Sequence, residues 1–166
     1  FELYRTKHGL VDSSAETKRL YWEWVESHFP GLSDACGCYV FTIRAPRGAL
    51  PWYIGKAERQ PFRKECLTPH KINHFNSVVS GRKGIPELFF LPQLTKTGNY
   101  RSPTSTKRPA IRELESLLIG MGLSRNSDLV NKIGTRWLQQ ITVEGFLNTP
   151  KNGRGASRAL RSLFGR

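Results

Sequence analysis

The amino-acid sequence predicts an α/β (α+β) fold in which a small, mainly antiparallel three-stranded sheet is flanked by helices. Three short runs, 39–43, 52–56 and 87–91, are rich in the β-branched and aromatic residues that strands favour. Two longer segments, one before and one after these runs, repeat apolar residues at helical spacing. With 166 residues, of which 38% are hydrophobic, the chain suits one domain with a packed core.

The first helix is expected to begin near Ser13. Ser13 and Glu16 form a capping box, and apolar residues recur at helical spacing until Pro30 interrupts the pattern. The first two strand-like runs, 39–43 and 52–56, then follow with a loop that contains proline and glycine between them. Because the connection is short, the two strands are expected to pair antiparallel.

The second half of the chain alternates helical segments with one more strand. Residues 59–80 are expected to be helical in part, since two prolines interrupt the pattern. After the third strand, residues 96–109 are basic and rich in Ser, Thr, Gly and Pro, which predicts a long exposed loop. Pro109 then introduces an amphipathic helix that Gly122 ends, and a last short helix is expected at 157–164.

These elements are expected to form a single domain over residues 1–166, with a helical extension at about 1–35 and a basic tail at about 149–166. No apolar run is long enough for a transmembrane helix and no leader pattern is visible, so no membrane association is expected. Cys36, Cys38 and Cys66 are odd in number and lack zinc-ligand spacing, which favours free thiols in a reducing, cytoplasmic compartment. Oligomeric state stays open.

The charge of the chain indicates its partner. Twenty-six Lys and Arg residues oppose thirteen Asp and Glu residues, which leaves a net charge of +13. Glu87 is the only acid between Cys66 and Arg112, and no acid follows Glu144. Such a concentrated excess favours binding to a polyanion, and we expect nucleic acid, with double-stranded DNA as the expected form. A basic surface that serves only solubility is the alternative.

Two triplets carry the most specific signal. The first is Gly37-Cys38-Tyr39 and the second is Tyr53-Ile54-Gly55, with thirteen residues between the two tyrosines. Further along the chain come Arg63, ten residues beyond Tyr53, then Leu114-Glu115-Ser-Leu-Leu-Ile119, then Asn131. In this order the elements resemble the GIY-YIG family of nucleases over residues 37–132, although Cys stands in the middle of the first triplet and the spacing between the triplets is slightly long.

The resemblance implies a metal-dependent endonuclease. In that family one tyrosine, more often the first, takes a proton from water, which here assigns the role to Tyr39 ahead of Tyr53. The Arg63 position clamps phosphate, and Glu115 binds Mg²⁺ or Mn²⁺. The chemistry is consistent with these roles, because a phenol is a poor base unless cations such as Lys56, Arg63 and a metal favour its charged form. The groups are expected on one face of the sheet, with Glu115 reaching in from its helix.

Further residues are assigned with alternatives open. His74 is expected as a catalytic acid or base and His70 as a substrate contact on the same helical face, although neither stands at the family's usual histidine position. Arg108 and Arg112 are expected to hold substrate phosphates. Asn131 is expected either to touch phosphate or to pin the metal helix.

The choice between neighbouring glutamates rests on the family pattern, because Glu113 and Glu115 flank the apolar stripe of their helix about equally. Taken one at a time, each selected residue also has an ordinary structural explanation, such as a core tyrosine or a surface arginine. The expected function is hydrolysis of phosphodiester bonds in DNA. The alternatives are a catalytically silent nucleic-acid-binding module with the same fold, and a nuclease effector delivered as a toxin.

Overall fold

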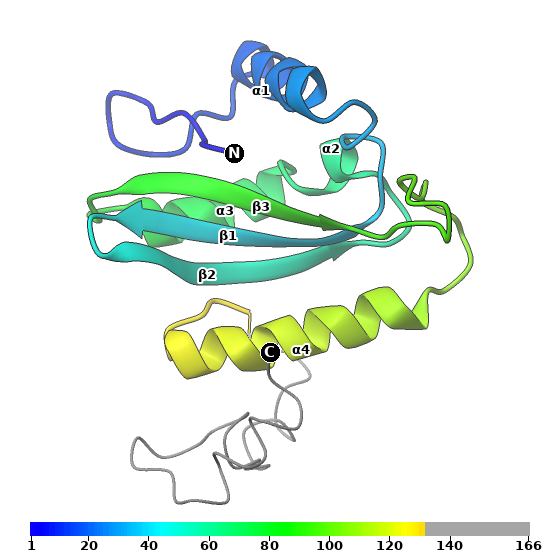
Figure 1. Cartoon of the computed structure of the whole chain (residues 1–166). Coiled ribbons are helices and arrows are strands. Elements are labelled where there is room, and N and C mark those ends of the chain that lie inside the picture. The colour runs from blue at the N-terminus through cyan, green and yellow to red at the C-terminus, as the bar shows by residue number, and fades with distance from the viewer. Residues whose placement is uncertain (132–166) are drawn as a thin grey trace, which may run out of the picture.

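Three strands form the middle layer of the structure, a computed structural model that describes residues 1–131. The elements, in chain order, are α1 (Ala15–His28), β1 (Gly37–Ala45), β2 (Gly48–Ala57), α2 (Phe62–Glu65), α3 (Pro69–Val79), β3 (Ile85–Pro92) and α4 (Pro109–Arg125). Figure 1 shows α1 on one side of the sheet and α4 on the other. The helix expected at 157–164 and the basic tail at 149–166 lie outside the described residues.

The sheet is antiparallel, with the strand order β2-β1-β3. The predicted α+β class is therefore confirmed, and each of the three expected strands is present and somewhat longer than expected. The loop expected at 45–51 is a tighter turn, because Gly48 has a positive φ of 112° and the strand resumes there. Pro51 is tolerated within β2 because β2 is an edge strand, where a missing N–H need not break a ladder hydrogen bond.

The two faces of the sheet are covered by different helices. On one face Tyr39, Phe41 and Tyr53 pack with α1 and α3, and the ring of Phe41 stacks on that of Phe75 at 4.1 Å between centroids. On the other face the alternate residues of β1 and β2, which are Cys38, Val40 and Ile54, pack against Ile111 and Ile119 of α4. This division follows from the period of two in a strand, and it decides which functional side chains can meet.

The first residues of the chain lie beside β3. The amino group of Phe1 donates to the carbonyl of Leu88, and the N–H of Leu3 donates to the carbonyl of Pro86. The segment thus covers part of the outer edge of β3, which would otherwise expose unpaired backbone groups. Among residues 1–131, no helix has both the length and the apolar character needed to cross a membrane.

Candidate active site

The tyrosines of the two triplets form one packed unit. Tyr39 of β1 and Tyr53 of β2 stack with their ring centroids 6.2 Å apart, as expected for residues on one face of paired strands. Gly55 lies directly opposite Tyr39 in the register. A Cβ at Gly55 would lie 2.5 Å from both Cζ and the hydroxyl oxygen of Tyr39. The backbone at Gly55 therefore packs closely against the ring of Tyr39, which leaves no room for a side chain there.

The hydroxyls of these tyrosines have different surroundings. The Tyr39 side chain is completely buried, and its hydroxyl has no hydrogen-bond partner among the described residues. Burial raises the pKa of Tyr39 far above the ordinary value of a phenol. The hydroxyl of Tyr53 instead accepts a hydrogen bond from Nζ of Lys71 at 2.7 Å. Of the two residues, Tyr53 has the hydroxyl that suits proton transfer.

Lys71 is the residue that sequence reasoning missed. Its ammonium lies 3.6 Å from Oε1 of Glu65 and 5.1 Å from the centroid of the Tyr53 ring. Burial by itself lowers the pKa of Lys71, but the hydrogen bond to Tyr53 and the nearby Glu65 outweigh that effect, so the net shift is upward and the ammonium stays charged. The available signal was spacing, since Lys71 and His74 are three positions apart and share a face of α3.

The two histidines of α3 lie next to this tyrosine. The Nε2 atoms of His70 and His74 are 3.2 Å apart, and the ring of His74 stacks on that of Tyr53 at 5.5 Å. Burial, together with the positive charges that His70 and Lys71 can carry, lowers the pKa of His74. His74 is therefore mainly neutral near neutral pH and can accept a proton. The structure thus brings both tyrosines and both histidines together.

Glu115 lies on the opposite face of the sheet. Its carboxylate Oε2 accepts a hydrogen bond from Nζ of Lys56, in an ion pair between α4 and β2. Lys56 follows Tyr53 by three positions and so points away from it, toward the face that α4 covers. The expectation that all active-site groups share one face is therefore wrong: the tyrosines and histidines lie on the α3 side, and Lys56 and Glu115 on the α4 side.

The geometry separates the two neighbouring glutamates of α4. Glu113 is exposed, whereas the Glu115 side chain is only 17% exposed and faces β2. Lys56 uses one oxygen of Glu115, which leaves the other for a metal ion. Residues 1–131 contain no cluster of three or more His, Cys, Asp or Glu side chains that could hold a metal. A single carboxylate still suits Mg²⁺, which keeps several waters and takes further ligands from phosphate.

Arg63 and Asn131 have structural partners. Arg63 of α2 pairs with Asp34 at 2.8 Å, and no ion pair or hydrogen bond joins its side chain to the tyrosine cluster within residues 1–131. Asn131 binds the backbone of Ile54 on β2: its Oδ1 accepts from the Ile54 N–H at 3.0 Å, and its Nδ2 donates to the Ile54 carbonyl. Of the two expected roles for Asn131, this contact fits the structural one, because it fixes the segment after α4 to the edge of the sheet.

Arg108 and Arg112 both contact Glu58, a carboxylate that is only 6% exposed just after β2. The backbone N–H of Arg108 donates to Oε1 at 2.6 Å, and Nε of Arg112 donates to Oε2 at 3.0 Å. The Arg108 backbone bond, followed by Arg112, lowers the pKa of Glu58. These contacts fix the start of α4 against the end of β2, close to the pair of Lys56 and Glu115.

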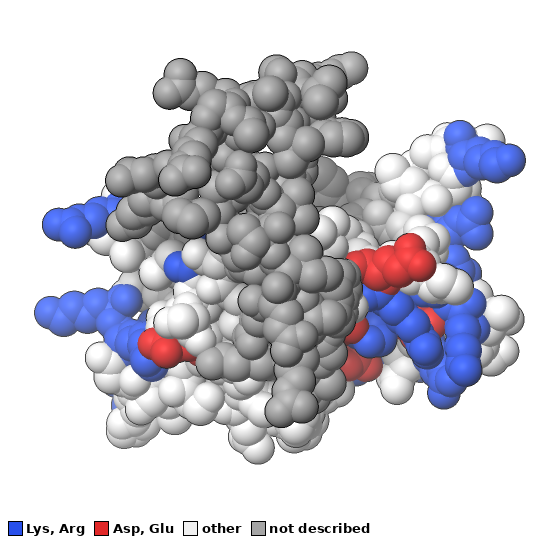
Figure 2. All heavy atoms as spheres, turned by 90° about the horizontal axis from the view of Figure 1, so that it is seen from below, with Lys and Arg blue, Asp and Glu red and all other residues white. Residues whose placement is uncertain are grey.

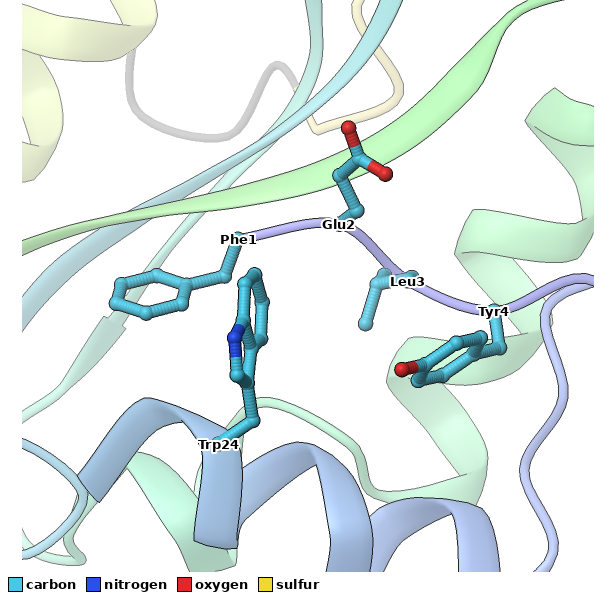
Figure 3. Close-up of a pocket in the computed structure, with 5 residues that line it drawn as sticks. All are labelled: Phe1, Glu2, Leu3, Tyr4 and Trp24. Carbon is cyan, nitrogen blue, oxygen red and sulfur yellow. The ribbon is translucent and has the colours of Figure 1, made fainter. Parts of the chain in front are cut away.

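A separate pocket of about 430 Å³ lies between the first residues of the chain and α1. Figure 3 shows the rings of Phe1 and Trp24 facing each other edge to face, while Glu2 points away from Trp24 toward β3. Leu3 and Tyr4 complete the lining, and none of these side chains is cationic. The amino group of Phe1 is positively charged but donates to the carbonyl of Leu88, so the pocket offers no cationic side chain to a phosphate substrate.

Comparisons of the chain with family models, with curated proteins and with solved structures found no match.

Proposed function

We propose that this protein is a metal-dependent endonuclease with a GIY-YIG-like domain, and that it hydrolyses phosphodiester bonds in DNA. One observation carries the proposal: the Tyr53 hydroxyl accepts a hydrogen bond from a charged ammonium, Lys71, beside a histidine that is mainly neutral. A tyrosine placed only to fill the core has no need of such a partner. A cationic donor on the phenol oxygen stabilises the phenolate, which is the form of tyrosine that can accept a proton.

In this proposal the phenol proton of Tyr53 first leaves to solvent, and the phenolate then takes a proton from the attacking water, whose oxygen bonds to phosphorus as the bond to the leaving oxygen breaks. Lys71 stabilises the charged oxygen of Tyr53, and Glu65 keeps Lys71 in place. Tyr39 supports Tyr53 by stacking and does not handle the proton, because its own hydroxyl is buried without a partner in the described part of the chain. His74 and His70 supply a second acid–base pair next to Tyr53.

The charge on the phosphate is neutralised from the other side of β2. Glu115 would hold Mg²⁺ or Mn²⁺ through its free oxygen, and such an ion supplies charge stabilisation to phosphate oxygens when bound. Lys56 adds a positive charge beside it. β2 is an edge strand, but Val130 and Asn131 pair with its backbone at Trp52 and Ile54, so a phosphodiester backbone that meets side chains from both faces must pass the edge beyond this contact, at Gly55 and Lys56. A strand in this position would contact both the tyrosines and histidines on the α3 side and the pair of Lys56 and Glu115 on the α4 side.

A catalytically silent nucleic-acid-binding module is the second candidate. The observation that favours it is internal pairing, because Lys56 is bound to Glu115 and Arg63 to Asp34. A nuclease must open these pairs when substrate arrives, whereas a binding module need not.

Incubation with supercoiled plasmid, with and without Mg²⁺, separates the two candidates. Cleavage should require Mg²⁺ or Mn²⁺ and vanish in EDTA. Glu115→Gln should cut at least ~100-fold more slowly, as expected for lost stabilisation of transition-state charge. Glu113→Gln is the matched control and should cut normally, since Glu113 is exposed. DNA binding without any cutting would establish the silent module instead, and full activity in chelated buffer would remove the metal from the proposal.

A further inference from the structure

A basic pocket of about 350 Å³ lies where the loop after β3 meets the start of α4. Its polar lining consists of Gln93, Arg101, Thr104, Thr106, Lys107 and Arg108. Among residues 1–131, no carboxylate lines it. Figure 2 shows Lys and Arg side chains gathered over the end of the molecule where α4 begins, with acidic side chains beside them. A hollow with three cations, two hydroxyls and no acid is complementary to a phosphate group.

Of the three cations of the pocket, one is held by hydrogen bonds within the protein and two are available to bind a ligand. Arg108 is fixed, because NH1 donates to Oε1 of Gln93 at 2.7 Å and NH2 donates to the carbonyl of Ser102 at 2.9 Å. Arg101 and Lys107 are exposed, and neither forms an ion pair within residues 1–131. Of the Arg101 guanidinium, only Nε makes a hydrogen bond among these residues, to the carbonyl of Leu94. These two side chains are available for a ligand.

The pocket has a fixed position relative to Glu115. Arg108 and Arg112 both bind Glu58, which ties the start of α4 to the end of β2. Glu115 follows Pro109, a residue of the pocket lining, by six positions. At ~1.5 Å per helical residue this separation is about 9 Å. A strand of B-form DNA winds around its axis while it advances ~3.4 Å per nucleotide, so its neighbouring phosphates are ~7 Å apart and about 9 Å corresponds to one or two nucleotides.

We propose that this pocket binds a backbone phosphate of the nucleic-acid strand, one or two nucleotides from the phosphate that lies at Glu115. The proposal rests on the proposed nuclease function for the position of the cut, but the binding itself does not require cleavage. The pocket gives affinity and holds the strand in register beside β2. It does not read sequence, since phosphate contacts are the same for every base.

The test is duplex binding in EDTA, measured by fluorescence anisotropy over a range of salt concentrations. The double variant Arg101→Ala/Lys107→Ala removes both available cations. The control Lys7→Ala/Lys83→Ala removes the same charge from exposed positions; Lys83 lies just before β3, whereas Gln93 of the pocket lies just after it. Counterion release predicts that the slope of log affinity against log salt falls by about 1 in the pocket variant. The control should keep the slope of the unaltered protein, and equal slopes for the two variants would overturn the proposal.

Two further outcomes are decisive. If the pocket variant lowers the salt slope but the unaltered protein never cuts plasmid, the pocket proposal is supported and the nuclease proposal fails. If the unaltered protein cuts plasmid but the pocket variant keeps the same salt slope, the nuclease proposal is supported and the pocket proposal fails. A polyglutamate peptide that binds the unaltered protein more tightly than duplex, and loses affinity in the pocket variant, would assign the pocket to an acidic protein and overturn it. In a substrate with a mapped cut, a neutral methylphosphonate should weaken binding most at one or two nucleotides from that cut.

Discussion

Replacing Tyr39 with Phe tests the division of labour between the two tyrosines. The change removes a hydroxyl that is fully buried and has no hydrogen-bond partner among residues 1–131, and it leaves the ring in place. Burying an unpaired hydroxyl costs about 1–3 kcal/mol in protein mutational data. Since the ring keeps its stack on Tyr53, we expect Tyr39→Phe to stabilise the protein by about 1 kcal/mol, which raises Tm by about 2–4 °C in a domain of this size.

For Tyr53 we expect the opposite effects on stability and cleavage. Tyr53→Phe removes the acceptor of the 2.7 Å hydrogen bond from Lys71 and leaves that half-buried ammonium with Glu65 as its remaining polar partner. We expect Tyr53→Phe to lower the free energy of unfolding by about 1 kcal/mol. A hydrogen bond to a charged group contributes more than this, but water recovers part of the loss. Plasmid cleavage should fall at least ~100-fold in Tyr53→Phe and stay within a few-fold in Tyr39→Phe.

The assays are thermal unfolding and cleavage rate at saturating plasmid, measured on both variants. If Tyr39→Phe folds normally but stops cutting, the Tyr39 hydroxyl handles the proton, as the family resemblance implies. If Tyr39→Phe is instead less stable than the unaltered protein, its hydroxyl has a partner that this reasoning omits. Retained cleavage in Tyr53→Phe would remove the observation on which the proposed function rests.

Two other substitutions probe the packing and the electrostatics. Gly55→Ala places a Cβ 2.5 Å from the ring of Tyr39. The ring must then shift by about 1 Å, which costs about 1–3 kcal/mol. Urea unfolding should show this loss of stability, and adding Tyr39→Leu should recover part of it. Glu58→Gln removes a carboxylate whose pKa is held below its ordinary value of 4.5. A depressed pKa gives stability that is present above pH 4.5 and lost as the pH falls through the folded value. The difference in urea midpoint between Glu58→Gln and the unaltered protein should therefore be large at pH 6 and shrink at pH 3, and an equal difference at both would refute the role of Glu58.

Local patterns in the sequence were sufficient to predict the sheet. The three strands have β-branched and aromatic runs, and the short connection between the first two allows only an antiparallel pair. The stack of Tyr39 on Tyr53 also follows from alternation, once the hairpin is assumed. The helical segment at 59–80 divides into α2 and α3 at its prolines, as expected. Each of these features depends on residues close together in the chain.

Other parts of the site depend on packing between distant elements. The pairing of Lys71 with Tyr53 requires that α3 cover this face of the sheet at a particular angle, which spacing along the chain does not give. Glu58 is an ordinary carboxylate in sequence and becomes buried only because α4 begins against the end of β2. The face on which Lys56 lies could have been predicted, because a separation of three residues from Tyr53 along a strand places the two side chains on opposite faces. The family pattern was given more weight than this parity, and the expectation of a single face was wrong.

The cations near the candidate site are paired with carboxylates, whereas two cations of the pocket are not, within the described part of the chain. The two sets are therefore expected to affect different kinetic constants. Lys56, Arg63 and Lys71 each have a carboxylate partner within 4 Å, so they add little to the field that a distant polyanion meets. The available positive charge of the pocket belongs to Arg101 and Lys107, which have no such partner among residues 1–131. Contacts that are equally strong in the bound and transition states lower KM without changing kcat. Loss of the pocket cations should therefore act through KM and salt dependence, whereas loss of Tyr53, Lys71 or Glu115 acts through kcat.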